Sequence, residues 1–139
     1  MKYFKLIYLS VFFGIVSILA FFNIVYSYYL NLYLNLNTYI YTLIVSIFFA
    51  ILFYYVKGND EKKITIYEKI LTILLGYFLL PLVISIPFYF SIYNLTFVNA
   101  FFESISGFTS TGFTIFDNIN HIDQGLILWR SSSQWIGGL

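Results

Sequence analysis

The sequence predicts an all-α, polytopic membrane protein with two N-terminal transmembrane helices followed by one helix–pore loop–helix repeat. Three observations predict this class. The chain of 139 residues is 60% hydrophobic and only 9% charged, which is too apolar for a soluble domain of this size. No acidic or basic residue occurs within residues 6–56 or within residues 70–102. A polar, glycine-centred segment, residues 109–114, then interrupts the apolar sequence.

The first charge-free stretch is about twice as long as the roughly 20 residues that cross a bilayer, so we expect it to hold two spans. These spans are residues 6–30 and 39–56, and an asparagine-rich turn over residues 31–38 joins them. Asn23 lies inside the first span, and we expect it to face another helix rather than lipid.

A third span is expected over residues 66–90, where Pro81 and Pro87 are expected to kink or end the helix. The next apolar segment, residues 97–107, is too short to cross the membrane. We expect it to dip into the membrane and return, with Thr96 as its N-cap.

These elements predict two parts, an N-terminal two-span hairpin with its following loop (residues 1–63) and the helix–pore loop–helix repeat (residues 64–139). The last apolar segment, residues 125–139, is again too short to cross a bilayer comfortably. We therefore expect the last helix to be incomplete and the chain to be a fragment or a truncated product.

The lysines predict the orientation. Lys2 and Lys5 precede the first span and Lys57, Lys62 and Lys63 follow the second, whereas the turn between the spans has none. The positive-inside rule therefore places the N-terminus and the loop after the second span in the cytoplasm, and the re-entrant segment on the outer side. A cleaved signal peptide is the alternative for the N-terminus, although its apolar run exceeds the usual ~7–15 residues.

The segment at residues 109–114 has the composition of a turn that binds cations through its backbone. Gly112 permits backbone angles that a Cβ would penalise, and the neighbouring Thr and Ser hydroxyls can brace the turn. Consecutive carbonyls can then replace the water around a monovalent cation. The partially negative C-terminal end of the helix at residues 97–107 would favour a cation there too. By itself, the segment fits an ordinary polar loop better, and the preceding short apolar helix and the flanking spans reverse that preference.

Two segments resemble a known family. Residues 101–114, Phe-Phe-Glu-Ser-Ile-Ser-Gly-Phe-Thr-Ser-Thr-Gly-Phe-Thr, resemble the first pore loop of the Trk/Ktr/HKT potassium transporter superfamily. Residues 129–138 carry an Arg, then Gln-Trp, then Gly-Gly, and resemble the start of that family's next helix. The chain is most similar to the bacterial TrkH/TrkG-type potassium uptake membrane subunits, which also have two extra N-terminal spans. The detailed resemblance covers the last third of the chain, and the rest matches in layout only.

The resemblance implies a selectivity filter at this loop, which the family builds from four such loops in one polypeptide. The implied residues are Ser110 and Thr111 for the potassium sites, Gly112 and Phe113 for the rest of the filter, and Thr109, Thr114 and Glu103 for filter support or mouth. Ser110 and Phe113 depart from the family's commoner residue types. This departure leaves the preference for potassium over sodium open.

The sequence also suggests roles for the charged residues and the histidine near the loop, and it leaves alternatives open for the acidic ones. Glu103 is expected to brace the filter or make its mouth negative, or else to be an interfacial carboxylate that reaches water. Asp117 and Asp123 attract cations to the entrance, or are solvated loop charges. Arg130 matches a family arginine and is expected to face protein or a water-filled cavity. His121 is the only histidine of the chain, so no metal site is expected.

The expected function is potassium uptake across the inner cell membrane, with potassium as the transported substrate, no cofactor and no enzymatic activity. No HExxH or GxSxG motif is present. The expected surroundings are the lipid bilayer, the remaining repeats of the full-length subunit, a second copy in a homodimer and a cytosolic nucleotide-binding regulatory subunit. The net charge of +1 argues against nucleic acid as a binding partner. The alternatives are a homotetrameric channel with one pore loop per chain, and a membrane scaffold that transports nothing.

A cysteine at position 60 tests the predicted topology. Asp60→Cys should react with a membrane-impermeant thiol reagent only after the membrane is permeabilised, because its loop is expected to face the cytoplasm. Since the chain has no native cysteine, labelling reports this position alone. Labelling of intact cells from the outside would reverse the predicted orientation.

Overall fold

The computed structural model describes residues 7–56, 66–118 and 121–138. In these ranges the chain forms helices and no strand: α1 (Ile7–Tyr29), α2 (Leu36–Tyr55), α3 (Ile66–Ile84), α4 (Ile86–Tyr89), α5 (Phe97–Phe108) and α6 (Gln124–Gly137). Three helical stretches are long and apolar enough to cross a membrane, namely Tyr8–Tyr29, Leu36–Tyr55 and Ile66–Tyr89. The chain is therefore an all-α, polytopic membrane protein, as its sequence predicted.

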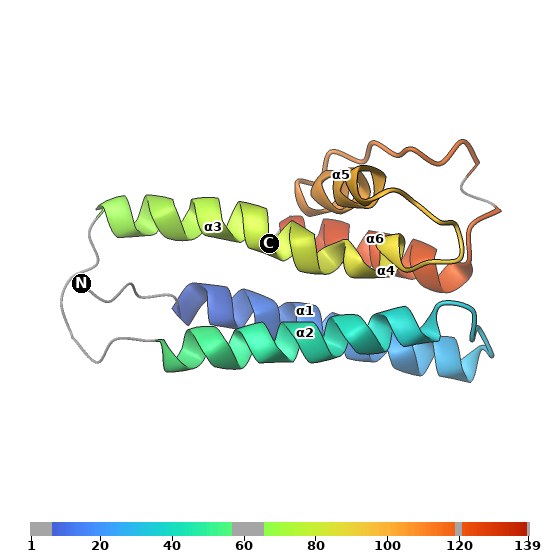
Figure 1. Ribbon diagram of the computed structural model, residues 1–139, viewed down its shortest axis with the longest axis horizontal. Coiled ribbons are helices and arrows are strands. Elements are labelled where there is room, and N and C mark those ends of the chain that lie inside the picture. Colours follow the sequence, from blue (N-terminus) through green and yellow to red (C-terminus); the bar gives the residue numbers. More distant parts are fainter. Residues whose placement is uncertain (1–6, 57–65, 119–120, 139) are drawn as a thin grey trace.

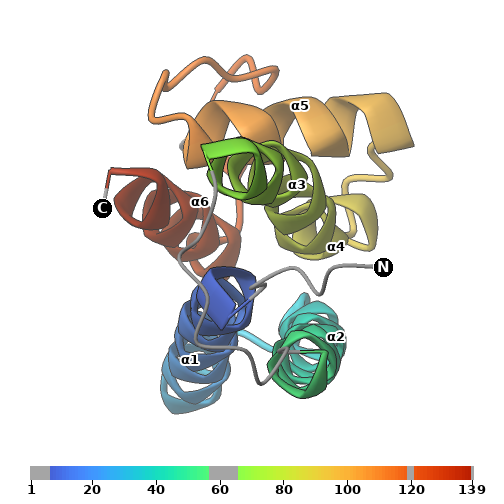
Figure 2. The same cartoon turned by 90° about the vertical axis from the view of Figure 1, so that its left-hand side faces the viewer.

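Helices α1 and α2 form a hairpin on one side of the bundle, and α3 to α6 lie together on the other side (Figures 1 and 2). Stacked rings hold the hairpin together, with the Phe13 ring centroid 5.3 Å from that of Phe49 and 5.6 Å from that of Phe53. The Ser10 hydroxyl donates a hydrogen bond across the hairpin to the Ala50 carbonyl (2.7 Å). Packing and a polar contact between helices thus associate the first two spans without any charged residue.

Helix α2 begins earlier than the sequence predicted. Asn37 and Thr38 were expected in the turn, but both lie in the first turn of α2, which begins after the N-cap residue Asn35. The Thr38 N–H and hydroxyl both donate to the Asn35 carbonyl (3.0 and 2.7 Å). A polar side chain that bonds back to the preceding turn is compatible with a helix, so composition alone misplaced this boundary.

The third span is interrupted near its C-terminal end, as its prolines predicted. Helix α3 includes Pro81 and ends at Ile84, and α4 begins two residues later with Pro87 in its first turn. Proline is tolerated at that position because the first N–H groups of a helix have no intrahelical partner. The Trp129 indole N–H of α6 donates to the Ile84 carbonyl (3.0 Å), which ties the interruption to α6.

Helix α5 does not run with the long helices. Figure 2 shows α5 lengthwise in a view in which the long helices are seen nearly end-on. The Thr96 hydroxyl accepts a hydrogen bond from the Asn99 N–H (3.3 Å), so the predicted N-cap is confirmed. Its 12 residues extend over only ~18 Å. The chain after α5 turns back toward the end of the bundle from which α5 started (Figure 1), which is the shape of a re-entrant loop.

Three connecting segments meet at that end of the bundle, and Asn35 joins them. Its side-chain amide donates to Asp123 Oδ2 (3.3 Å), and its side-chain oxygen accepts from the Ile92 N–H (3.2 Å). The asparagine-rich turn and the re-entrant segment therefore lie at the same end. The lysines that predict which end faces the cytoplasm, at positions 2, 5, 57, 62 and 63, lie outside the described residues.

Two glycines bring α5 and α6 into close contact. A Cβ on Gly137 would overlap the carbonyl group of Phe108, and a Cβ on Gly107 would overlap the Ser133 hydroxyl. The C-terminal end of α5, and the loop that follows it, therefore lie directly against α6.

Gly137→Ala should lower the free energy of unfolding by about 1–3 kcal/mol, because the added methyl group forces α6 away from the Phe108 backbone. Gly14→Ala is the matched helical control, since a Cβ at Gly14 would meet no atom within 4 Å. This control should be neutral or stabilising by up to ~1 kcal/mol. Thermal unfolding in detergent compares the two variants, and equal effects would contradict the contact between α5 and α6.

Candidate functional site

The chain reverses direction immediately after α5 through two residues with positive φ, Ser110 (56°) and Gly112 (78°). Glycine adopts this conformation freely, as the sequence predicted for Gly112. For serine it costs about 1–2 kcal/mol. Ser110 is anchored by its hydroxyl, which donates to the Gln134 carbonyl of α6 (3.0 Å). The reversal leaves residues 109–113 exposed, with Phe113 at 70% exposure.

Ser106, near the end of α5, braces the reversal from the inside. Its carbonyl accepts a hydrogen bond from the Thr111 N–H (3.1 Å), and its hydroxyl donates to the Phe113 carbonyl (2.6 Å). Thr109 ends α5 with its hydroxyl donating to the Ile105 carbonyl (2.8 Å). Ser106 was not among the functional residues predicted from the sequence. Its signal was a small hydroxyl residue one turn before the predicted loop, within reach of that loop's backbone.

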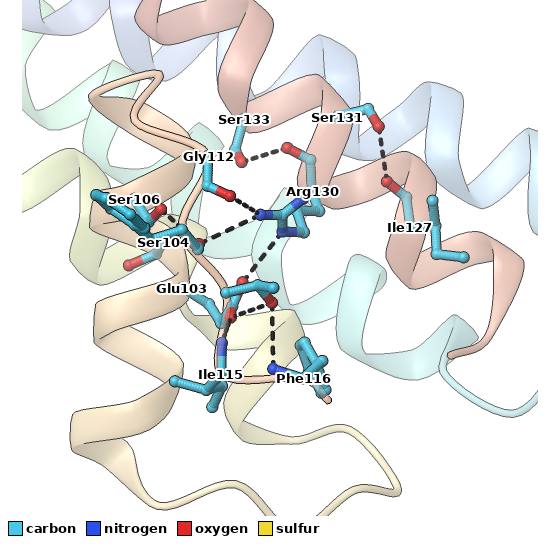
Figure 3. Close-up of polar contacts among 12 residues, drawn as sticks. Glu103, Ser104, Ser106, Gly112, Ile115, Phe116, Ile127, Arg130, Ser131 and Ser133 are labelled. Carbon is cyan, nitrogen blue, oxygen red and sulfur yellow. Dashed lines mark hydrogen bonds and ion pairs between the residues drawn. The ribbon is translucent and has the colours of Figure 1, made fainter. Parts of the chain in front are cut away.

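A buried ion pair lies behind the loop (Figure 3). Glu103 is 0% exposed, and its Oε2 accepts from Arg130 Nε at 3.1 Å. Its Oε1 accepts from the Thr114 hydroxyl (2.7 Å) and from the Ile115 N–H (2.6 Å). Both carboxylate oxygens are therefore engaged, as a buried charge requires. This burial contradicts the alternative in which Glu103 is an interfacial carboxylate that reaches water.

Arg130 also holds the backbone of the loop. Its Nη2 donates to the carbonyls of Gly112 (2.9 Å) and Phe113 (3.2 Å). Figure 3 shows the guanidinium reaching from α6 to Glu103 on one side and Gly112 on another. The rigid fork of a guanidinium can bind a carboxylate and carbonyl oxygens at the same time, which an ammonium does less well. The expectation that Arg130 faces protein is confirmed.

These contacts divide the carbonyls of the loop into two groups. The carbonyls of Gly112 and Phe113 accept hydrogen bonds from Arg130, and that of Phe113 also accepts one from Ser106. Within the described residues, no hydrogen bond ends on the carbonyls of Thr109, Ser110 or Thr111. Two of these three available carbonyls, those of Ser110 and Thr111, belong to the residues for which the family resemblance implies potassium sites.

The charges around the loop leave a neutral surface for a ligand. Residues 109–113 carry no ionisable side chain, and Glu103 and Arg130 neutralise each other behind them. A cation at this surface would meet only carbonyl and hydroxyl oxygens, the ligands of a site that binds and releases monovalent ions.

The acidic residues after the loop differ from one another. Asp117 is exposed, whereas Asp123 is half-buried and bonded to Asn35, so Asp123 is not the solvated loop charge that was one expectation. His121 is exposed. In the part of the chain that the structure describes, no group of three His, Cys, Asp or Glu residues is placed to hold a metal ion.

Glu103 and Arg130 were predicted in separate segments of the chain, and their pairing was not predicted. Each is the only charged residue of its helix, α5 or α6. Opposite charges in two apolar membrane segments are expected to pair, because neither charge is tolerated alone at depth. That pattern was the signal available in the sequence.

The proteins with similar sequences are named as transporters. The chain is 31% identical over 127 residues to an uncharacterized cation transporter of Methanocaldococcus jannaschii, a match that covers 91% of this chain and 27% of that protein. It is 45% identical over 60 residues to the Trk system potassium uptake protein TrkI of Halomonas elongata (43% of this chain, 11% of that protein). It is 30% identical over 96 residues to the Trk system potassium uptake protein TrkH of Escherichia coli (68% and 20%).

The chain thus spans about a quarter or less of the length of these relatives. It matches no protein-family model, and no solved structure matches it significantly.

Glu103→Gln tests the buried ion pair. It keeps the shape of the side chain but removes the charge opposite Arg130, and should lower the free energy of unfolding by about 3 kcal/mol. Asp117→Asn is the control, because it removes an exposed carboxylate and should change stability by less than ~0.5 kcal/mol. Denaturant titration in detergent measures both variants. A Glu103→Gln protein as stable as the control would exclude the pair as a structural element.

Proposed function

Because this chain is a relative of the Trk potassium uptake proteins, we propose that it supplies one pore loop, residues 109–113, to a potassium-selective uptake pathway through the membrane. The observation that carries the proposal is the run of unengaged carbonyls at Thr109, Ser110 and Thr111. They lie on an exposed, uncharged loop that a buried ion pair holds from behind.

The loop suits a monovalent cation because its available ligands are neutral and weak. Such an ion enters a pore when oxygens replace its water, and it leaves again because no single ligand binds it strongly. A carboxylate at the same place would hold the ion too tightly. Here the one nearby carboxylate, Glu103, is engaged by Arg130, Thr114 and Ile115 instead.

Arg130 fixes the loop rather than facing the ion. Its guanidinium binds the carbonyls of Gly112 and Phe113, and this anchors the backbone on one side of the Ser110 and Thr111 carbonyls. Gly107 and Gly137 bring α6 close enough for this contact. The positive charge of Arg130 is neutralised by Glu103, so it does not repel a cation at the neighbouring carbonyls.

One loop offers too few oxygens to surround an ion, so the pathway requires further loops around the same axis. We propose that these come from further repeats of the same subunit, which the greater length of the relatives supports. The exposure of residues 109–113 in this chain provides a surface on which they can gather.

The distribution of lysines supports an inner-membrane location with the N-terminus in the cytoplasm. A homodimer of the full-length subunit and a cytosolic nucleotide-binding regulatory subunit are proposals that rest on the family resemblance.

Gly112→Ser tests the filter assignment. In a subunit that contains this chain, the substitution should reduce rubidium-86 uptake about tenfold, because a strain of ~1–2 kcal/mol at φ 78° moves the adjoining carbonyls. A Cβ at this position would meet only Gln134 Nε2, at 3.9 Å, so the loss would report backbone strain rather than a clash. Growth of a strain that lacks other potassium uptake systems, at micromolar potassium, gives a second readout.

The matched control for this experiment is Asp117→Asn, which changes an exposed charge beside the loop and should leave uptake nearly unchanged. Normal potassium uptake with normal exclusion of sodium in Gly112→Ser would refute the filter assignment.

A further inference from the structure

Three buried side-chain atoms in the described part of the chain have no hydrogen-bond partner: Asn23 Oδ1, Ser27 Oγ and the Tyr39 hydroxyl. All three belong to the α1–α2 hairpin, and Ser27 and Tyr39 are 0% exposed. A buried polar atom without a partner is costly, and more so in a membrane, where lipid offers none. Where two or more such atoms converge, they point to a small polar ligand.

Two of these atoms converge on Gly125, in the first turn of α6. A Cβ on Gly125 would lie 3.0 Å from Ser27 Oγ, 3.0 Å from the Tyr39 hydroxyl and 3.0 Å from Asp123 Oδ2. Three oxygens therefore bound the space beside Gly125, and a Cβ there would contact all three tightly. They come from α1, from α2 and from the residue that precedes α6, so the space lies where the hairpin meets the pore repeat.

We propose that this space holds one buried water molecule that bridges Ser27, Tyr39 and Asp123. A buried water makes roughly three hydrogen bonds to polar groups that otherwise have no partner. Here it can donate to the Asp123 carboxylate and to one hydroxyl, and accept from the other hydroxyl. Every polar atom that faces the space is then satisfied.

A monovalent cation fits the space less well than water does. Only three protein oxygens converge on it, whereas such a cation needs many weak oxygen ligands to replace its hydration shell. The Asp123 charge is also partly offset already. Its Oδ2 accepts from the Asn35 amide (3.3 Å), and Asp123 is the N-cap of α6, at the partially positive end of that helix.

The bridging water fastens the hairpin to the start of α6. Asp123 already contacts the cap of α2 through Asn35, and its N–H donates to the Tyr93 hydroxyl in the α4–α5 connection (2.6 Å). The water adds α1 and the first turns of α2 to this junction through Ser27 and Tyr39. It therefore helps to fix the position of the helix that carries Arg130.

The sign of a stability change distinguishes bridged hydroxyls from unpartnered ones. Ser27→Ala and Tyr39→Phe each remove one hydroxyl without adding volume, and each should lower the Tm of the chain by about 2–6 °C when a water bridges them. The double variant should lower the Tm by less than the sum, because both substitutions remove bonds to the same water. Ser46→Ala is the matched control and should shift the Tm by under ~1 °C. Its hydroxyl is equally buried but bonds to the Leu43 carbonyl of its own helix (3.0 Å).

The Tm values are measured on the full chain in nanodiscs, with choline as the only monovalent cation and then with potassium or sodium. An unchanged or raised Tm in Ser27→Ala and Tyr39→Phe would overturn the proposal, because loss of an unpartnered buried hydroxyl does not destabilise. Additive losses would show that the two hydroxyls share no ligand, and would also overturn it. A Tm that rises in potassium or sodium, but not in Tyr39→Phe, would identify a bound cation instead of water. None of these outcomes depends on the proposed transport function.

Discussion

The buried ion pair between Glu103 and Arg130 is the interaction on which the packing of α5, α6 and the loop after α5 depends. Helices α5 and α6 carry one charge each, and an apolar bundle tolerates neither charge alone. The two helices can be buried only together, and Gly107 and Gly137 allow the approach that this requires. From that position Arg130 also reaches the carbonyls of Gly112 and Phe113. The packing of the two helices and the shape of the loop therefore both follow from the need to pair these two charges.

The same constraint separates the loop's structural carbonyls from those open to a ligand. Gly112 and Phe113 face the arginine, while Ser110 and Thr111 lie on the exposed turn with their carbonyls unengaged among the described residues. Under the proposed function, a loop held from behind by charge and open in front through neutral oxygens exchanges a monovalent cation without trapping it. The site therefore requires charged residues in an apolar protein but does not require that they touch the ion.

Local chemistry made much of the fold predictable from the sequence. Hydropathy indicated the membrane spans, and Thr96 indicated the start of α5. Pro87 indicated the break after α3, and Gly112 indicated a positive φ in the loop. In each case the residue acts on its own neighbours along the chain. The predicted start of α2 was wrong, because the polar residues before position 39 were assigned to the turn. The hydrogen bond from Thr38 to the Asn35 carbonyl is compatible with a helix there.

The contacts that join distant segments were not predictable in the same way. The pairing of Glu103 with Arg130 and the half-buried position of Asp123 depend on which helices meet, and at what depth. Apolar sequence sets helix length but not the rotation of one helix against another. Only the isolated opposite charges of α5 and α6 carried such long-range information.

A double-mutant cycle of Glu103→Gln and Arg130→Gln, read as the ratio of rubidium-86 to sodium-22 uptake by a subunit that contains this chain, tests the central claim most directly. If the ion pair sets the loop, each single substitution should lower the ratio. The double variant should then be no worse than the more impaired single variant, because the two residues act as one unit. Losses that add independently, or a ratio that neither substitution changes, would contradict the claim that this pair holds the filter.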